Sequence, residues 1–396
     1  MRRLSAVALL CSALLAGAAC GGEAATPPAV VRVVLVDAFT GPSAVRGTSV
    51  QNSVQLEIDA LNAGGGLLGR RVELVAADDE TKASKAADLV REYLADERVG
   101  LVVGPGGTAT YTAARLWVDQ ARVPDCLPVR VADGAVGGAA TFRTRSADRT
   151  EATVLLDYVQ KRTQVRRLGA LAAGGAEAQE VDQELADLAP RSGLEYAGSV
   201  SLEDVPDARA AVQQLAARGA QGVLLPGDVD SAAQAVRALQ DLGLRDQVAT
   251  FGFDQLAVLA YPDQAREAVA GTIVISPIRA DLTDRPSATW PPAYRAFVRD
   301  LAARYGYTPN GVEIRGLPEA AECVHLWTRA VRRAGGFDGQ AVSRAWEALQ
   351  VDADEAVLGV PERFTPRQHD ALASDGLFVY RWARKGDQYR LQQLVP

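Results

Sequence analysis

Histidine and cysteine are scarce in this chain of 396 residues, which contains two histidines and four cysteines. So few of either residue exclude a zinc-cluster architecture and a small scaffold held together by many disulfides. Positive charge is not in excess, because 42 basic residues against 49 acidic ones leave a formal net charge of −7. We therefore expect no nucleic-acid partner. With 48% hydrophobic and 23% charged residues, the composition is globular, and the length predicts two domains or three.

Sequence motifs of common catalytic sites are also missing. The glycine-rich segment 104–108 lacks the Gly-Lys-Ser/Thr ending with which a P-loop holds phosphate and magnesium. No Gly-x-Ser-x-Gly elbow is present to expose a hydrolase nucleophile. His325 is expected on a helix over 319–333 beside the core, and His369 in a solvated polar stretch over 365–375, so the two form no general acid–base pair. We expect no enzymatic activity, no metal site and no cofactor.

A long apolar run occurs only at the N-terminus. Arg2 and Arg3 precede an almost entirely apolar stretch over residues 4–15. At about 12 residues this stretch is too short to cross a bilayer, which takes about 20, and it is typical of a signal peptide. Export from the cytoplasm is therefore expected.

Cys20 follows this stretch and resembles the cysteine of a bacterial lipoprotein signal. Small residues precede it and a polar, Pro-containing segment follows, although Gly17 stands where leucine is usual. We expect residues 1–20 to be a lipoprotein signal peptide with lipid attached to Cys20, and residues 21–30 to be a tether. The alternative is a plain secretory signal in which Cys20 is incidental.

Export changes the interpretation of the remaining cysteines. Cys11 is removed with the signal, which leaves Cys126 and Cys323 in the mature body. In an oxidising compartment two such cysteines most often form a disulfide, and two buried free thiols are the alternative.

The mature body alternates short apolar runs with amphipathic segments. Such alternation predicts βαβ units, parallel sheets and helices on both sheet faces, and the number of units favours two α/β lobes over one sheet. Strands are expected over 31–36, 72–75, 100–103, 168–171, 222–225, 248–251 and 271–275. Helices are expected over 50–61, 86–94, 108–121, 154–159, 181–188, 207–218 and 231–242.

Three expected strand-to-helix junctions are rich in Gly, Ser or Thr. They lie at 40–43, 104–110 and 251–254. Ligands of open parallel sheets bind at the carboxyl ends of the strands. Backbone N–H groups at a helix start, with the hydroxyls of Thr108 and Thr110, are suited to a carboxylate, and an acidic residue of the other lobe could meet an ammonium group. Taken alone, each glycine cluster is more typical of a tight turn, and only several of them in register favour a ligand site.

An ordered series of segments resembles the type I periplasmic binding proteins, in particular the branched-chain amino-acid-binding group that serves ABC importers. The segments are 40–47, 56–70, 72–75, 78–79, 102–105, 142–144, 219–223, 271–274 and 294–298. The resemblance implies two Rossmann-like parallel-sheet lobes joined by a three-stranded hinge and closing on a ligand. It places lobe 1 at 31–143 and 278–350, lobe 2 at 144–277, and the hinge return with a lobe 2 tail at 351–396. Cys126 then follows the fourth strand, and both cysteines fall in lobe 1.

The resemblance also implies binding residues, with departures from the family pattern. Thr108 aligns with the family serine that holds the ligand carboxylate. Asp254, or Asp228 as a second candidate, corresponds to the acidic partner of the ammonium group. Helix N-capping is the alternative for each of these two aspartates. Arg130 either binds a further acidic group or forms a hinge salt bridge. The remaining expected contacts are Thr40, Ser43, Gly106, Gly107 and Thr110. A second hydroxyl contact is missing at 128–133, and so is an aromatic residue at 173–176.

The expected function is that of a binding lipoprotein on the outer face of the cell membrane. It would deliver a small polar solute, an amino acid or a related metabolite, to an ABC permease. A sensor module of the same fold that is not coupled to transport is the alternative.

Overall fold

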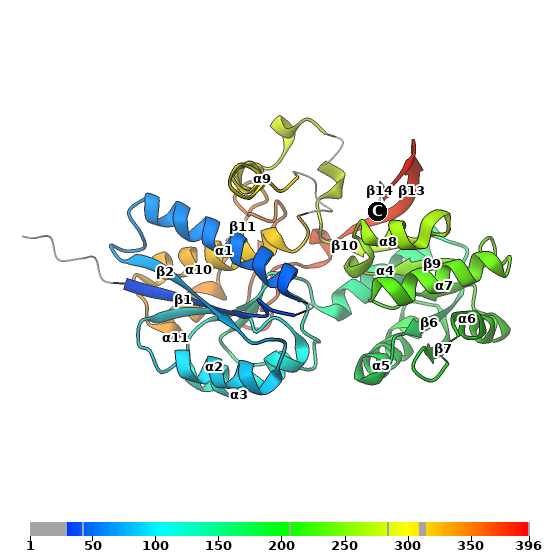
Figure 1. Ribbon diagram of the computed structural model, residues 1–396, viewed down its shortest axis with the longest axis horizontal. Coiled ribbons are helices and arrows are strands. Elements are labelled where there is room, and N and C mark those ends of the chain that lie inside the picture. The colour runs from blue at the N-terminus through cyan, green and yellow to red at the C-terminus, as the bar shows by residue number, and fades with distance from the viewer. Residues whose placement is uncertain (1–29, 42, 206, 283–284, 309–313, 395–396) are drawn as a thin grey trace, which may run out of the picture.

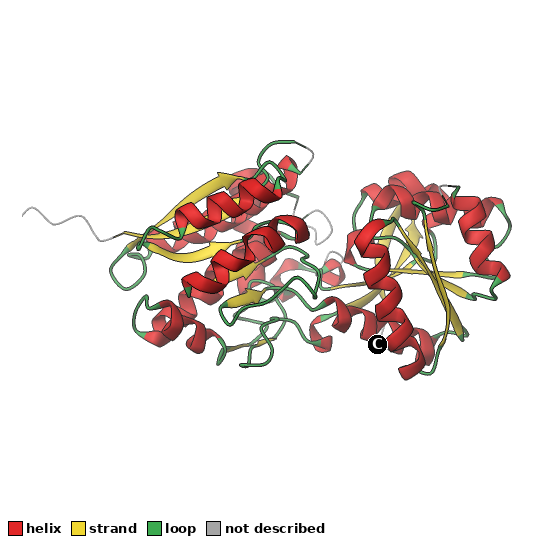
Figure 2. Cartoon of the chain, turned by 90° about the horizontal axis from the view of Figure 1, so that it is seen from below, coloured by secondary structure: helices red, strands yellow, loops and turns green. Residues whose placement is uncertain are grey.

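The computed structural model describes residues 30–394 except 42, 206, 283–284 and 309–313. The expected signal peptide with Cys20, and the tether up to residue 29, lie outside the described residues. Two α/β lobes lie next to each other along the longest axis of the molecule (Figure 1). In both, helices cover the two faces of a sheet (Figure 2), which confirms the predicted fold class.

The first lobe is built on a five-stranded parallel sheet of order β2-β1-β3-β4-β5. Its strands are β1 (Val30–Asp37), β2 (Arg71–Asp78), β3 (Val99–Val103), β4 (Asp125–Leu127) and β5 (Thr141–Arg143). Its helices are α1 (Ala44–Ala63), α2 (Ala83–Tyr93), α3 (Thr108–Ala121), α9 (Pro292–Tyr305), α10 (Leu317–Ala334) and α11 (Gly339–Trp346). The β1 side chains alternate between a core shared with α1, α10 and α11 and a core shared with α2 and α3. This burial on both faces explains why β1 is an almost continuous apolar run.

The second lobe has a seven-stranded sheet of order β14-β13-β10-β9-β8-β6-β7. Its parallel strands are β6 (Arg167–Ala172), β7 (Glu195–Ser201), β8 (Gly222–Leu224), β9 (Ala249–Gly252) and β10 (Ile273–Ser276). The C-terminal hairpin β13 (Phe378–Lys385) and β14 (Gln388–Leu394) adds two antiparallel strands. Helices α4 (Asp148–Arg162) and α5 (Gly175–Arg191) pack on one face, and α6 (Ala208–Ala217), α7 (Val229–Asp241) and α8 (Ala260–Ala265) on the other. A two-stranded ribbon, β11 (Gln350–Val351) and β12 (Glu362–Arg363), precedes the hairpin.

The two sheets repeat one topology. The five strands of the first sheet lie in the order β2-β1-β3-β4-β5. The five parallel strands of the second sheet lie in the matching order β7-β6-β8-β9-β10. The direction of chain winding therefore reverses between β1 and β3 and again between β6 and β8. Ligands of such sheets bind in the crevice outside the carboxyl ends of these strands. Each lobe thus contributes one candidate binding edge.

The chain passes between the sheets three times, after β5, after β10 and before β13. The first and third passages are hydrogen-bonded to each other, because Arg143 N donates to His369 O at 2.8 Å and Ala371 N to Arg143 O at 2.8 Å. His369 is consequently half-buried: its Nδ1 lies 2.9 Å from Thr141 O and its ring stacks on Phe142 with centroids 4.6 Å apart. The prediction of a solvated His369 is wrong, since this return segment packs against β5.

Cys126 and Cys323 form a disulfide with a Cα–Cα distance of 5.8 Å. The bond joins β4 to α10 within the first lobe, and Cys126 lies inside β4 rather than after the strand. In the part of the chain that the structure describes, no helix is both long and apolar enough to cross a bilayer.

Candidate functional site

Asp37 marks the carboxyl end of β1 at the binding edge of the first lobe. It is 2% exposed, and its Oδ1 lies 2.7 Å from Arg46 Nη2. Burial raises the pKa of Asp37, while Arg46 opposes that rise. A Cβ added to Gly106 would come within 2.3 Å of Asp37 Oδ1, so only glycine allows the loop after β3 to pass over this carboxylate. Neither Asp37 nor Arg46 was predicted as a site residue, because their pairing depends on the packing of α1 against β1.

The start of α3 places Thr108 at the same edge. Thr108 is exposed, and its Oγ1 accepts a hydrogen bond from Ala132 N at 3.1 Å. Thr110 is buried and donates to Gly107 O at 3.0 Å, so its proton closes the first helical turn. Of these two hydroxyls, that of Thr108 is the better placed to meet a solute.

The loop after β1 holds the other two predicted hydroxyls. Thr40 is exposed and donates from Oγ1 to Asp78 Oδ2 at 2.7 Å. Ser43 occupies the N-cap position of α1 without a side-chain capping bond. Both residues therefore lie at the predicted edge, but the donor of Thr40 already has a carboxylate partner.

A pocket lies at the carboxyl ends of β6 and β8 in the second lobe, and Arg130 of the first lobe contributes to it. Its cavity volume in this arrangement of the lobes is about 30 Å³. It is lined by Arg130, Leu171, Ala172, Ala173, Val181, Leu224, Leu225, Pro226, Gly227, Phe253 and Gln255. The pocket is thus mostly apolar, with a guanidinium and an amide as its polar side chains among the described residues. Residues of both lobes meet here at the edge that the topology selects.

Asp254 belongs to a buried ion-pair network beside this pocket. It is 1% exposed, and its Oδ2 accepts from Arg145 Nη2 at 2.7 Å and from Arg315 Nη1 at 3.3 Å. Although burial opposes ionisation, Arg145 and then Arg315 lower the pKa of Asp254. The network joins the first passage between the lobes, the second lobe and the segment before α10. N-capping does not describe Asp254, since Phe253 holds the cap position of the short helix η1 (Asp254–Leu256).

Glu151 on α4 extends the network. Its carboxyl accepts from Ser146 Oγ at 2.6 Å and lies 3.7 Å from Arg145 Nη2. Burial and then the charge of Asp254 raise the pKa of Glu151 to about 8. Glu151 is therefore mostly protonated at neutral pH, and Asp254 is the carboxylate that accepts from both guanidinium groups. The buried Glu319 also interacts with Arg145 and Arg315, and burial raises its pKa.

The structure separates the remaining two candidates. Asp228 is exposed and caps α7 by accepting from Ser231 N at 2.8 Å, as the capping alternative describes. Arg130 Nε donates to Asp148 Oδ1 at 3.0 Å, as the hinge alternative describes, while its side chain stays 30% exposed and lines the pocket. Arg145, Arg315 and Gln255 were not predicted, because their roles depend on residues far away in the sequence.

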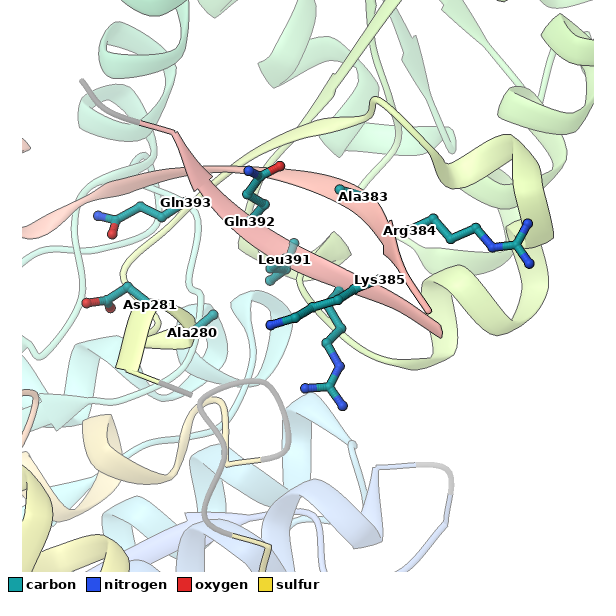
Figure 3. Close-up of a pocket in the computed structure, with 9 residues that line it drawn as sticks. Ala280, Asp281, Ala383, Arg384, Lys385, Leu391, Gln392 and Gln393 are labelled. Carbon is teal, nitrogen blue, oxygen red and sulfur yellow. The ribbon is translucent and has the colours of Figure 1, made fainter. Parts of the chain in front are cut away.

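A second hollow lies between the β13–β14 hairpin and the short helix η3 (Ala280–Leu282) (Figure 3). Basic residues Arg384, Lys385 and Arg390 line it, together with Asp281, which is paired to Arg279 Nε at 2.9 Å. None of the described residues that line this hollow lies at either candidate binding edge, so we do not assign the solute site to it.

Residues 30–387 match the model of a family described as periplasmic binding protein. The chain belongs to this family. Such proteins bind solutes outside the cytoplasm, and the predicted similarity to their Leu/Ile/Val-binding members is confirmed. A Leu/Ile/Val-binding protein homolog from Brucella suis is 22% identical over 382 residues, which cover 93% of this chain and 92% of the relative.

Solved periplasmic binding proteins share the fold. The substrate-binding protein LivJ of a branched-chain amino acid transporter from Streptococcus pneumoniae, solved with isoleucine, has a TM-score of 0.68 at 19% identity. This similarity covers 92% of this chain and 100% of LivJ. A solute-binding protein of an ABC transporter from Rhodopseudomonas palustris, solved with 4-hydroxybenzoate, has a TM-score of 0.74 at 15% identity. This similarity covers 92% of this chain and 96% of the solved chain.

Proposed function

We propose that this protein is an extracytoplasmic solute-binding lipoprotein that captures a small solute, an amino acid or a related metabolite, between its lobes and delivers it to an ABC permease. The observation that carries the proposal is the pocket where Arg130 of the first lobe meets the carboxyl ends of β6 and β8. A solute seated there contacts both lobes at once. The solved relatives with isoleucine and 4-hydroxybenzoate support a small organic solute as the ligand.

Closure about the hinge supplies the mechanism. A solute that contacts both lobes binds the closed arrangement more tightly than the open one and shifts the population towards it. The three passages between the sheets allow one lobe to turn on the other, while the disulfide braces the first lobe without crossing the hinge. The permease then meets a loaded, closed protein.

A thermal-shift screen of the purified protein tests solute binding. Amino acids, amides, urea and small carboxylates form the panel, and a ligand at one hundred times its Kd adds about 2.7 kcal/mol to stability. Thr108→Ala is expected to weaken the affinity for a confirmed ligand, whereas Thr112→Ala, exposed one turn further along α3, leaves it unchanged. Absence of any ligand from the panel would contradict the proposed function.

Membrane attachment is tested separately on Cys20. A Cys20→Ala variant is expected to move from the membrane fraction to the soluble exported fraction and to lose incorporation of labelled fatty acid. An unchanged membrane fraction would contradict the lipid anchor but not solute binding. Loss of solute uptake on deletion of the gene separates delivery to a permease from the sensor alternative.

A further inference from the structure

The carboxylate expected to receive an ammonium group already has two cationic partners. Asp254 Oδ2 lies 2.7 Å from Arg145 Nη2 and 3.3 Å from Arg315 Nη1, and the residue is 1% exposed. An arriving ammonium group would be a third cation beside one buried carboxylate. Since like charges in a poorly solvated site repel strongly, this position disfavours a zwitterionic amino acid.

The other carboxyls near the pocket do not replace Asp254. Asp148 pairs with Arg130 at 3.0 Å, and Asp228 caps α7 through Ser231 N. Glu151 accepts from Ser146 and is mostly protonated at neutral pH. Among the described residues that line the pocket there is no Asp or Glu. Glu184 on α5 and the buried Glu319 interact with Arg130 and with Arg145, respectively, but neither lines the pocket. The described lining of the pocket therefore offers an ammonium group no carboxylate.

The same pocket is suited to an anion with an apolar body. Arg130, which already pairs with Asp148 through Nε, lines it with a guanidinium. A guanidinium carries five N–H donors in a planar array, so it can bind more than one carboxylate. With its amide oriented to satisfy both neighbours, Gln255 donates to Asp254 Oδ1 at 2.9 Å. Its oxygen lies 3.2 Å from Arg130 Nε and shares that N–H with Asp148 Oδ1, so both residues hold the guanidinium beside the pocket. The remaining lining is aliphatic apart from Phe253.

Two helices add to the preference for negative charge. Ala173 and Gly227 line the pocket and lie just before the N-caps of α5 and α7, which have 17 and 13 residues. The positive ends of both helix dipoles are therefore close to the apolar lining and to Arg130.

We infer that the site takes a compact apolar monocarboxylate that lacks an α-ammonium group, with its carboxylate at Arg130 and its body against the aliphatic wall. This inference rests on the proposed function, because it names the solute class of the same cleft. It departs from the amino-acid ligand that the resemblance implies, and the reason is the pairing of Asp254.

Matched ligand pairs test the inference by titration calorimetry on the purified protein. The pairs are leucine with 4-methylpentanoate and phenylalanine with 3-phenylpropanoate, which differ only in the ammonium group, and 4-methylpentanamide removes the carboxylate charge. We expect at least one carboxylate to bind tenfold or more tighter than both its amino-acid partner and its amide. Equal or tighter binding of the amino acid overturns the inference and leaves the proposed function standing. If no ligand of either pair and no solute of the panel binds, both the inference and the proposed function are overturned.

Arg130→Gln and Arg130→Lys locate the carboxylate. We expect Arg130→Gln to weaken carboxylate binding at least tenfold, with little change for the amide, and Arg130→Lys to recover part of the loss. The control is Arg149→Gln, on the neighbouring α4, whose guanidinium pairs with Asp187 and which does not line the pocket. Circular dichroism confirms that each variant is folded. Unchanged carboxylate affinity in folded Arg130→Gln overturns the assignment.

Discussion

Replacing Asp254 by asparagine removes the negative charge that Arg145 and Arg315 share. The Arg145 side chain is 7% exposed, so its guanidinium stays buried after the substitution. Removing one partner of a buried pair destabilises a protein by about 3–5 kcal/mol, because the remaining charge has lost both solvent and counter-charge. Glu151 moderates this cost, since its carboxyl lies 3.7 Å from Arg145 and can ionise once Asp254 is neutral. We therefore expect a larger loss in mildly acidic buffer than at pH values near 8.

Urea denaturation followed by tryptophan fluorescence measures the loss. Asp241→Asn is the matched control, because Asp241 pairs with Arg209 at 3.2 Å on the surface, with 58% of its side chain exposed. Exposed pairs contribute only about 0.2–1 kcal/mol. A double variant, Arg145→Met with Asp254→Asn, is expected to recover part of the stability, because no buried charge is then left without a partner. A loss below about 1 kcal/mol for Asp254→Asn at acidic pH would refute the reasoning.

Three further predictions concern stability. Replacing Cys126 and Cys323 by alanine removes a disulfide that closes a loop with a sequence separation of 197. The chain-entropy model predicts that the free energy of unfolding falls by up to about 5 kcal/mol. No change in the urea midpoint would contradict this prediction. Burial raises the pKa of Glu322 to about 8 from its ordinary 4.5, so the folded state binds the extra proton and stability falls as pH rises from about 4.5 towards 8. Glu322→Gln should reduce that fall by up to about 1.4 kcal/mol per pH unit, and urea midpoints of the two proteins across this range check it. Gly106→Ala introduces a Cβ 2.3 Å from a buried carboxylate oxygen and is expected to cost about 1–3 kcal/mol. At Gly134, where an added Cβ meets nothing within 4 Å, the same change should cost much less in a thermal melt.

Local sequence patterns predicted the regular elements well. The helix expected over 108–121 is α3, Thr108–Ala121, and the strand expected over 31–36 lies inside β1, Val30–Asp37. The strand is an almost continuous apolar run and the helix is amphipathic, so each is recognisable from its own residues, whichever elements cover it. The hairpin β13–β14 gave no such signal, because one side of β14 is exposed and its pairing with β13 depends on the return of the chain across the hinge.

The candidate site was predicted less completely than the fold. The sequence placed Thr108 at a helix start, and the structure keeps its hydroxyl at the binding edge. It could not say that Asp228 only caps a helix while Asp254 pairs with two arginines, because both residues follow a strand in a short Gly-containing loop. The distinction depends on partners from other passages of the chain.

The amino-acid sequence by itself determined the α/β class, the two lobes and the candidate binding edges of their sheets, because these follow from short-range periodicity and from the rules of parallel-sheet winding. Only the tertiary structure decided the charge of the site. The partners of Asp254 lie 109 and 61 residues away, at Arg145 and Arg315. Ion pairs over such separations form when packed lobes exclude water around them, and no local pattern in the chain encodes them.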